Sequence, residues 1–548
     1  MPTTPRSRIL RARVLLPPAL ACTAALALLA PLSAHASPTA AARATPSGAP
    51  DAASGPAATT PATADERRVD AYLDTVRRRP GRLAAFLRAM PKGGELHSHL
   101  SGAVSTELLM ELAAEDGLCV DDATSTALAP PCRAGSRPAT DLRTDDAMRL
   151  RVLRAWSMQD FDPAAAGETG HDHFFATFGK FGEVAWRHPG RMLAEVLNTA
   201  AEHRQFYQEL MQTPAWGEDR KLADKVGWDP DLARMHQKIT ADGAMDALVR
   251  TARDEADTTT AEFRAAARCD TDAPQPACAV PFRFISQVAR ESSPARVFIQ
   301  MTLAMALAER DHRFVAVNLV QPEDGEVALR DYRLHMRMLD FLHARYPNAH
   351  ITLHAGELVA GLVKPEHLRF HIAEAVRTGH AERIGHGVDI REEDGFDDVL
   401  RTMAERRVAV EVPLTSNHQI LGVQGRDHPF TLYREHGVPV VLATDDQGVS
   451  RITVSDEYAR ATATYGLTYR ELKDLARASL EHAFLDGRSL WKAPGHYRPV
   501  ADCAGVRPGT RTPPARCAGF LKTNAKAAVE WRQEAAFTRF ERTVPAPR

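Results

Sequence analysis

Two histidines separated by one residue stand in the segment 94–100, which reads GELHSHL. Side chains two positions apart on a β-strand point to the same face of the strand. If this segment is a strand, the imidazoles of His97 and His99 enter one cavity, as two ligands of one metal ion must. Taken alone, the same pattern also fits two buried or surface histidines that bind nothing.

A third histidine, His354, closes the apolar run 351–353 and is followed by Ala355, Gly356 and Glu357. This histidine would add a third nitrogen ligand. The small, flexible Ala-Gly pair would let the Glu357 carboxyl reach the same cavity without binding the metal. The alternative is an ordinary strand end with an exposed glutamate.

His386 stands between two glycines in the segment RIGHG, and Asp445 and Asp446 follow the apolar run 440–443. The glycines allow a tight turn that leaves the imidazole uncovered, which suits proton handling better than packing. Two adjacent carboxylates at a buried strand end repel each other unless a cation or a hydrogen-bond donor neutralises them. The alternative, a solvated turn with two aspartates, fits poorly after Val-Val-Leu-Ala.

These motifs need a scaffold that brings distant segments together. Short apolar runs recur along the chain with helical segments between them, and the regular alternation over 350–445 favours parallel βαβ units. An open doubly wound sheet is the alternative, but the chain has no G-x-G-x-x-G turn. We count eight predicted strands: 94–100, 205–211, 283–290, 314–321, 350–356, 382–388, 408–414 and 438–444.

Eight such units closing on themselves predict the fold class α/β, a TIM (β/α)₈ barrel with inserted loops and an N-terminal helical extension. The motifs lie at the carboxyl ends of the first, fifth, sixth and eighth predicted strands. Barrel active sites form at that face. Three histidines and one aspartate gathered there would make a mononuclear zinc site with an open position for water.

The domain organisation follows from the same pattern. We predict an N-terminal helical segment at 65–90, a barrel over 91–487 and a C-terminal extension at 488–548. Two segments near 117–145 and 212–280 interrupt the alternation. They are predicted to be insertions in βα connections, and therefore lids or partner surfaces.

The N-terminus predicts export. Four arginines precede an apolar run, and Ala34-His35-Ala36 supplies a small-x-small cleavage site, so residues 1–36 are predicted to be a signal peptide. Residues 37–64 are rich in Ala, Pro and Thr and predict a flexible linker. The mature protein is then periplasmic or extracellular. A membrane anchor is the alternative, but Pro17 and Pro18 argue against it, and a lipoprotein linked through Cys22 fits less well because that cysteine lies inside the apolar run. No later apolar run is long enough to span a bilayer.

Composition agrees with export and excludes one class of partner. Six cysteines beyond Cys22 fall as three sequence-local pairs, which predicts disulfides in an oxidising compartment. A zinc cluster is the alternative, but no C-x-x-C spacing exists, and the pairing stays open. With 68 Lys+Arg against 70 Asp+Glu, the net charge is −2, so nucleic acid is a poor partner. The cysteines are Cys119, Cys132, Cys269, Cys278, Cys503 and Cys517.

Together, these motifs resemble the adenosine deaminase family, in particular its secreted branch, which includes the adenosine deaminase-related growth factors. The resemblance covers about residues 88–487, apart from the two insertions. It is carried by MPKGG at 90–94, LHSHL at 96–100, FYQE at 206–209, HAGE at 354–357, RIGHG at 383–387, PLTSN at 413–417, HP at 428–429 and TDD at 444–446.

The resemblance implies one Zn²⁺ per chain and hydrolytic deamination of adenosine or 2′-deoxyadenosine to inosine or 2′-deoxyinosine plus ammonia. It implies that Glu357 protonates purine N1 while an activated water attacks C6. His386 would orient and deprotonate that water, and Asp446 would contact the purine near N7. The implied zinc ligands are His97, His99, His354 and Asp445.

Three positions depart from the family pattern and bear on the substrate. Ser101 stands where the family often has an aspartate that touches the ribose. Gln321 lies in the motif where a family glycine approaches the purine, and Gln447 replaces the proline after Asp446. The alternative substrate is therefore adenine or another 6-aminopurine. In either case the expected partner is a small purine nucleoside or base. The oligomeric state stays open, and no membrane contact is expected after signal cleavage.

Other classes of protein fit these sequence motifs less well. The cytidine-deaminase type of zinc site needs H-x-E and P-C-x-x-C, which are absent in that arrangement. A barrel phosphoesterase commonly needs a second metal and a bridging lysine, and no lysine stands at the matching strand ends. A binding or signalling protein that uses the barrel as a scaffold would tolerate loss of a ligand, yet every ligand position is filled.

Overall fold

The computed structural model describes residues 62–546. The predicted signal peptide and most of the predicted linker lie outside the described residues, as does Cys22. The chain divides into two units, Met1–Ala58 and Thr59–Arg548. All that follows concerns the second unit.

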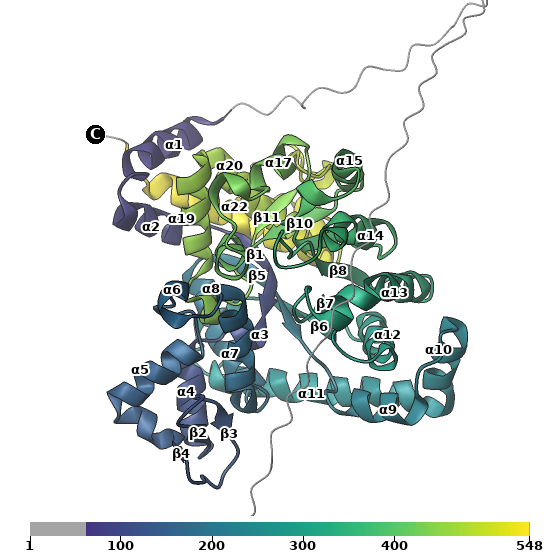
Figure 1. The fold of residues 1–548 in the computed structure, drawn as a ribbon. Coiled ribbons are helices and arrows are strands. Elements are labelled where there is room, and N and C mark those ends of the chain that lie inside the picture. The colour runs from purple at the N-terminus through teal and green to yellow at the C-terminus, as the bar shows by residue number, and fades with distance from the viewer. Residues whose placement is uncertain (1–61, 547–548) are drawn as a thin grey trace, which may run out of the picture. The chain divides into compact units, whose positions relative to one another are not determined.

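Eight parallel strands form a single sheet in the order β1-β5-β6-β7-β8-β9-β10-β11 (Figure 1). The sheet closes because Ser98 of β1 pairs with Asp445 just after β11, and the Asp445 N–H donates to the His97 carbonyl over 3.0 Å. The predicted (β/α)₈ barrel is confirmed. The strands are β1 Gly93–His99, β5 Gln205–Gln212, β6 Phe282–Ala289, β7 Phe314–Val320, β8 His350–Ala355, β9 Arg383–His386, β10 Ala409–Val412 and β11 Val440–Leu442.

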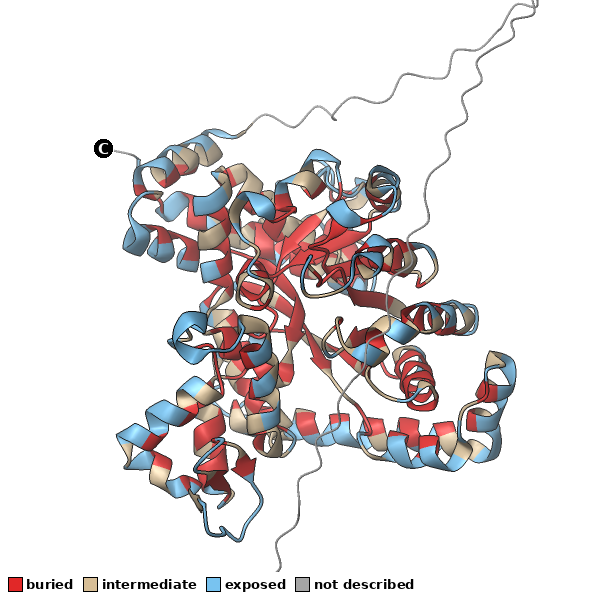
Figure 2. Cartoon of the chain, in the orientation of Figure 1, coloured by how far each residue is buried: buried red, intermediate tan, exposed pale blue. Residues whose placement is uncertain are grey.

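Apolar helices follow the strands and cover the barrel, as the buried strands and helix faces in Figure 2 show. Helix α12 is buried along almost its whole length and packs on β6 and β7. The helices are α8 Pro189–Glu202 before β5, α12 Pro294–Arg310, α13 Glu326–His343, α14 His371–Arg377, α15 Phe396–Arg406, α16 Leu414–Leu421, α17 Phe430–Glu435, α18 Gln447–Ser450, α19 Val454–Tyr465 and α20 Tyr469–Glu481.

A buried ion-pair network ties three strands together inside the barrel. The Arg383 guanidinium of β9 donates to Glu209 of β5 over 2.6 Å and pairs with Glu411 of β10 over 2.5 Å. All three side chains are almost completely buried. Buried charges persist only when they are paired in this way, so the network fixes the strand ends relative to one another.

The helical segment before β1 consists of α1 Ala64–Val76 and α2 Pro80–Ala89. Helix α1 begins one residue earlier than the predicted segment, because Thr63 and Glu66 form a capping box at its start. Its buried residues Val69, Leu73 and Val76 form the apolar stripe of the helix.

The first insertion follows the short helices α3 Leu100–Ala103 and α4 Thr106–Glu115. It is a small antiparallel sheet in the order β3-β2-β4, closed by the disulfide Cys119–Cys132. Its elements and the helices that lead back to α8 are β2 Cys119–Asp121, β3 Ala127–Leu128, β4 Ser136–Pro138, η1 Ala139–Arg143, α5 Asp146–Ala155, α6 Pro163–Ala166 and α7 Gly170–Ala185.

The second insertion is helical. Its long helix α11 packs against α8, and the disulfide Cys269–Cys278 closes the loop before β6. Figure 1 shows α9 and α11 beside α12, with α10 at the outer end of the insertion. The elements are α9 Glu218–Val226, α10 Leu232–Thr240, η2 Ala241–Gly243, α11 Ala244–Ala266 and η3 Pro276–Ala279.

The C-terminal extension contains α21 Ala515–Thr523 and α22 Ala525–Thr543, with the disulfide Cys503–Cys517 between η7 Ala501–Cys503 and α21. Helix α22 packs on α20 and β5, so the extension belongs to the same unit as the barrel. All three sequence-local cysteine pairs are therefore disulfide-bonded.

Within residues 62–546, no helix combines the length and apolar composition needed to cross a membrane. Three short 3₁₀ turns complete the elements: η4 Pro365–Arg369, η5 Ile390–Glu392 and η6 Gly425–Asp427.

Candidate metal centre

The four residues expected to bind metal converge at the carboxyl end of the barrel. One ligand atom from each of His97, His99, His354 and Asp445 lies within 4.8 Å of each of the others. The His99 and His354 Nε2 atoms are 3.2 Å apart, and each of His97 and His99 Nε2 lies within 3.5 Å of Asp445 Oδ1. Three imidazole nitrogens and one carboxylate around a common centre form a donor set that suits Zn²⁺.

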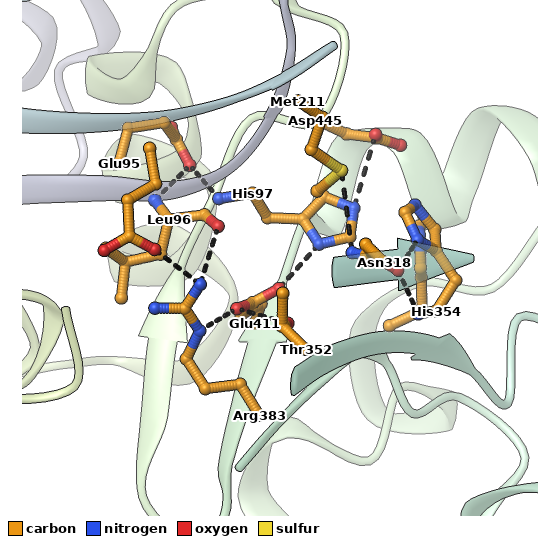
Figure 3. A network of polar contacts seen from close by, with 12 residues as sticks. Glu95, Leu96, His97, Met211, Asn318, Thr352, His354, Arg383, Glu411 and Asp445 are labelled. Atoms are coloured by element: carbon orange, nitrogen blue, oxygen red, sulfur yellow. Dashed lines mark hydrogen bonds and ion pairs between the residues drawn. The ribbon is translucent and has the colours of Figure 1, made fainter. Parts of the chain in front are cut away.

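Each imidazole is also held at its other ring nitrogen. His97 Nδ1 donates to Glu411 over 2.7 Å, and His354 Nδ1 donates to Asn318 Oδ1 over 2.9 Å. Figure 3 shows this network, in which Arg383 also pairs with Glu411. Such partners fix the ring orientation and tautomer, so that the lone pair of each Nε2 faces the centre.

His99 has a neutral amide as its partner. Gln287 Nε2 lies 2.7 Å from His99 Nδ1, and the Thr213 hydroxyl lies 3.0 Å from Gln287 Oε1. A threonine hydroxyl both donates and accepts, so the amide can turn over without losing this bond. In the turned orientation the amide oxygen accepts from His99 Nδ1–H, and Nε2 keeps its lone pair for a metal.

The electrostatics of the cluster fit a site that could hold a cation. Burial lowers the pKa of the His97 imidazole, but hydrogen bonds and charges from Asp445 and Glu411 outweigh it and raise the pKa to about 10. Burial and the neighbouring imidazoles hold the pKa of His354 well below its usual value. The buried His97 Nε2 lies 3.5 Å from Asp445 Oδ1, at the limit of hydrogen-bond distance. One positive charge at the centre would satisfy these groups together.

The glycine before His386 is required by close packing. A Cβ atom at Gly385 would lie 2.4 Å from His97 Cε1, so only glycine fits beside this ring. His386, Asp445 and Gln321 all have left-handed backbone at strand ends, with φ of 69°, 58° and 80°. Non-glycine residues rarely adopt this conformation, and such residues concentrate at functional sites.

His386 lies next to the ligand cluster and faces Glu357. Its Nδ1 donates to Asn417 Oδ1 over 2.8 Å, and Asn417 Nδ2 donates to His428 over 2.8 Å. The other nitrogen, Nε2, is buried without a partner among the described residues and lies 3.8 Å from Glu357 Oε1. Burial lowers the pKa of His386 to about 4, so the ring is neutral and Nε2 keeps a lone pair that can accept a hydrogen bond.

Two buried carboxyls beside the cluster favour the protonated form. Burial and the charge of Asp445 raise the pKa of Glu357 to about 8. Burial and Asp445 also hold the pKa of Asp446 well above its usual value, while Asp445 itself stays ionised because of its histidine partners. Asp446 Oδ1 has no partner among residues 62–546. The site therefore combines an anionic ligand with two carboxyls that can donate protons.

The turn that carries Glu357 is anchored from behind by Glu323, which lies just after β7. The Glu323 carboxylate accepts from the backbone N–H groups of Gly356 and Glu357 over 3.1 and 2.8 Å. It also accepts from His371 Nδ1 over 2.6 Å. Gly356 has φ +75°, and a Cβ there would lie 2.6 Å from Asp389 Oδ1. Glu323 and this glycine together set the direction of Glu357.

The two remaining predicted substrate residues are placed differently. Ser101 lies in α3 directly after β1 and is partly exposed. Gln321 stands at the end of β7, but its side-chain oxygen accepts from the Glu291 N–H over 3.0 Å. Its carbonyl accepts from the buried Arg290, which also donates to the His354 carbonyl. The Gln321 side chain is therefore hydrogen-bonded to the loop between β6 and α12.

Sequence reasoning missed the residues that support the cluster. Gln287, Asn318 and Glu411 each interrupt an apolar strand, and Ser416 donates to Asp445 Oδ2 over 2.7 Å. The available signal was a polar residue inside a strand that is otherwise mostly apolar, as in β6, β7 and β10. Glu323 carries no such signal, because it lies in a loop.

Comparison with known proteins points to one family. A protein-family model described as adenosine deaminase matches residues 169–490. The match begins after β1, so His97 and His99 lie outside it. The adenosine deaminase of Escherichia coli strain SMS-3-5 is 36% identical over 187 residues, which cover 34% of this chain and 51% of that protein. The chain thus spans about half the length of the curated relatives it matches.

Solved structures with a related fold are more distant in sequence. An N6-mAMP deaminase from Arabidopsis is 22% identical with a TM-score of 0.47, over 73% of this chain and 95% of that chain. An adenine deaminase from Arthrobacter aurescens is 19% identical with a TM-score of 0.45, over 82% of this chain and 99% of that chain.

Proposed function

This chain belongs to the adenosine deaminase family, and we propose that it is a zinc-dependent enzyme that deaminates adenosine or 2′-deoxyadenosine by hydrolysis. The observation that carries the proposal is the juxtaposition of a cation-binding cluster with Glu357. Its carboxyl lies beside His386 and Asp445, and its pKa is raised to about 8 by burial. A neutral carboxyl beside a metal site is the arrangement that purine deamination needs.

We assign the metal to His97, His99, His354 and Asp445. The fit rests on the donor set, on the convergence of one ligand atom from each of the four residues and on the support of each imidazole at its second nitrogen. A bound zinc ion would supply Lewis acidity, which makes water a nucleophile at neutral pH. Four protein donors around one centre fit one ion per chain.

The chain's own residues then handle protons. Glu357, protonated near neutral pH, donates to purine N1 and makes C6 more electrophilic. The unpartnered His386 Nε2 accepts a hydrogen bond from the attacking water and takes its proton. The protonated Asp446 carboxyl donates to N7. After water has added at C6, His386 gives its proton to the departing amine, which leaves as ammonia. The C6 hydroxyl returns a proton to the Glu357 carboxylate, and the 6-oxo purine remains.

The alternative substrate is adenine or another 6-aminopurine. Ser101 replaces the aspartate that the family often places near the ribose, and the Gln321 side chain is held by Glu291 instead of facing a ligand. Both observations concern nucleoside recognition, and neither affects the proton-handling groups. The proposed partner is a small purine molecule in either case.

The test is an ultraviolet absorbance assay of the purified protein over adenosine, 2′-deoxyadenosine, adenine and N6-substituted purines. We expect adenosine and 2′-deoxyadenosine to have the highest kcat/KM. Turnover of adenine or an N6-substituted purine with none of adenosine would replace the substrate assignment. No turnover of any 6-aminopurine by zinc-loaded protein would overturn the proposed function.

We further propose export to the periplasm or the medium. The support is the signal-like sequence of residues 1–36 and the three disulfides Cys119–Cys132, Cys269–Cys278 and Cys503–Cys517. N-terminal sequencing of the protein secreted by its host should begin near residue 37. An intact N-terminus in the cell lysate would contradict the proposal.

A further inference from the structure

A cavity lies at the end of the barrel opposite the metal cluster. It has a volume of about 790 Å³ and is lined by the first residues of β8 and β9, the segment before β10 and the loop after α20. His350 begins β8, Arg383 begins β9, and Val408 precedes β10, so the cavity opens at the amino ends of these strands. Its volume is within the range of small-molecule sites.

Each acidic residue that lines this cavity already has a hydrogen-bond or ion-pair partner within the protein. The Glu382 carboxylate accepts from His350 Nδ1 over 2.9 Å, and Asp486 pairs with Arg283 over 3.4 Å. The Glu481 carboxylate accepts from the Gly495 N–H over 3.1 Å. Each carboxylate on the wall therefore has a donor of its own.

Three of the four cations on the wall have no carboxylate partner among residues 62–546. Arg383 is neutralised inside the barrel by Glu209 and Glu411. Arg406 donates only to the Val376 carbonyl, over 2.7 Å, and the Lys526 ammonium donates to the Glu481 carbonyl over 2.7 Å.

Arg407 is the least satisfied of these cations. Its Nε is buried without a hydrogen-bond partner in the described part of the chain, and its guanidinium lies against Gly495, where a Cβ would be 3.6 Å from Nη2. The neighbouring His482 is also unpartnered at Nε2. Burial, followed by the charges of Arg407, Lys526 and Arg383, lowers the pKa of His482 to about 3.

We propose that this cavity binds a small molecule bearing an oxyanion, a phosphate or a carboxylate group, through Arg407, Arg406 and Lys526. A guanidinium with free donors offers paired N–H groups that match the oxygens of either group. The oxyanion would supply the anionic partner that Arg406, Arg407 and Lys526 lack, and it would offset the desolvation of Lys526, whose pKa burial lowers. This site is separate from the metal cluster and from the proposed catalytic groups.

The test is isothermal titration calorimetry of the full-length protein at low ionic strength with inorganic phosphate, sulfate and succinate. We expect saturable binding of one anion per chain at this site. Arg407→Gln should weaken it about tenfold or more, because a charge-assisted hydrogen bond is lost. Lys526→Gln is a second variant with the same expected direction. Binding of phosphate and sulfate without succinate identifies a phosphate-type group, and binding of succinate extends the site to carboxylates.

Arg268→Gln is the matched control. Arg268 also follows a helix with left-handed backbone (φ 57°), is exposed, and lies in the second insertion away from this cavity. Its substitution should leave anion binding unchanged. The proposal is overturned if none of the three anions binds saturably to the wild-type protein. It is equally overturned if Arg407→Gln and Lys526→Gln bind as the wild type does, since the anion then binds elsewhere.

Discussion

At the scale of single residues, the surroundings of each buried carboxyl decide whether it is ionised or protonated. Asp445 and Asp446 are neighbours in the chain, yet the first is held ionised by histidines and the second is held protonated by burial. Burial also raises the pKa of Glu357, which favours its protonated form. The equally buried Glu323 has a lowered pKa because His371 and Arg290 outweigh the effect of burial. Four carboxyls near one another thus take different roles.

Glu357→Gln should abolish turnover with the metal retained, because glutamine keeps the size of the side chain but cannot donate the carboxyl proton. His99→Ala should lose both turnover and metal. Steady-state kinetics together with elemental analysis of each variant checks this pair. Near-wild-type activity of Glu357→Gln would remove the proton-donor role from this residue.

Glu323→Gln should lower kcat roughly tenfold with a smaller change in KM, because one backbone N–H of the Glu357 turn loses a charged acceptor worth about 1.5 kcal/mol. Metal content should not change, since Glu323 contacts no ligand side chain. Separate measurement of kcat and KM tests this positioning role.

The matched control for Glu323 is Glu393→Gln. Glu393 is a buried acid nearby that accepts from the Ile372 and Ala373 N–H groups of α14 and does not contact the turn. Equal kcat losses in the two variants would show that any change in this buried region disturbs the site.

At the scale of elements, the strands could be predicted from the sequence, but the roles of the polar residues inside them could not. All eight predicted strands are present, and their ends agree with the structure to within two residues. Apolar runs bounded by polar turns identify a buried parallel strand directly. The partner of Glu411 or Asn318 lies on a strand far away in sequence, so no local pattern shows that each supports a different histidine.

The pH dependence of stability can be tested at the contact of α22 with the segment after α20. Glu530 is fully buried and accepts from the Leu490 N–H over 2.6 Å, and burial raises its pKa from 4.5 to about 7. The folded protein keeps this proton up to about pH 7, whereas the unfolded chain releases it near pH 4.5. The contribution of Glu530 to the free energy of unfolding therefore falls as the pH rises between these values, by roughly 3 kcal/mol.

Urea denaturation of the wild type and of Glu530→Gln from pH 5 to pH 8 measures this contribution. The stability of the variant relative to the wild type should increase across the range, because glutamine does not titrate. The exposed Glu435→Gln should show no such trend. A constant difference between Glu530→Gln and the wild type would contradict the burial argument.

At the scale of the whole molecule, a regular barrel carries irregular additions that differ in how far the sequence predicts them. The insertions and the C-terminal extension were expected as segments, and their cysteines as local pairs. Their contents were not: the first is a three-stranded sheet and the second a helical arm around α11. Short strands such as β3, with two residues, carry too little periodicity to be recognised.

The most direct test of the central claim is the metal content of the purified full-length protein. Elemental analysis after exhaustive dialysis should find one zinc ion per chain in the wild type and none in His354→Ala, which removes a ligand while leaving the fold of β8 in place. Absence of divalent metal from active wild-type protein, or two tightly held ions per chain, would contradict the account.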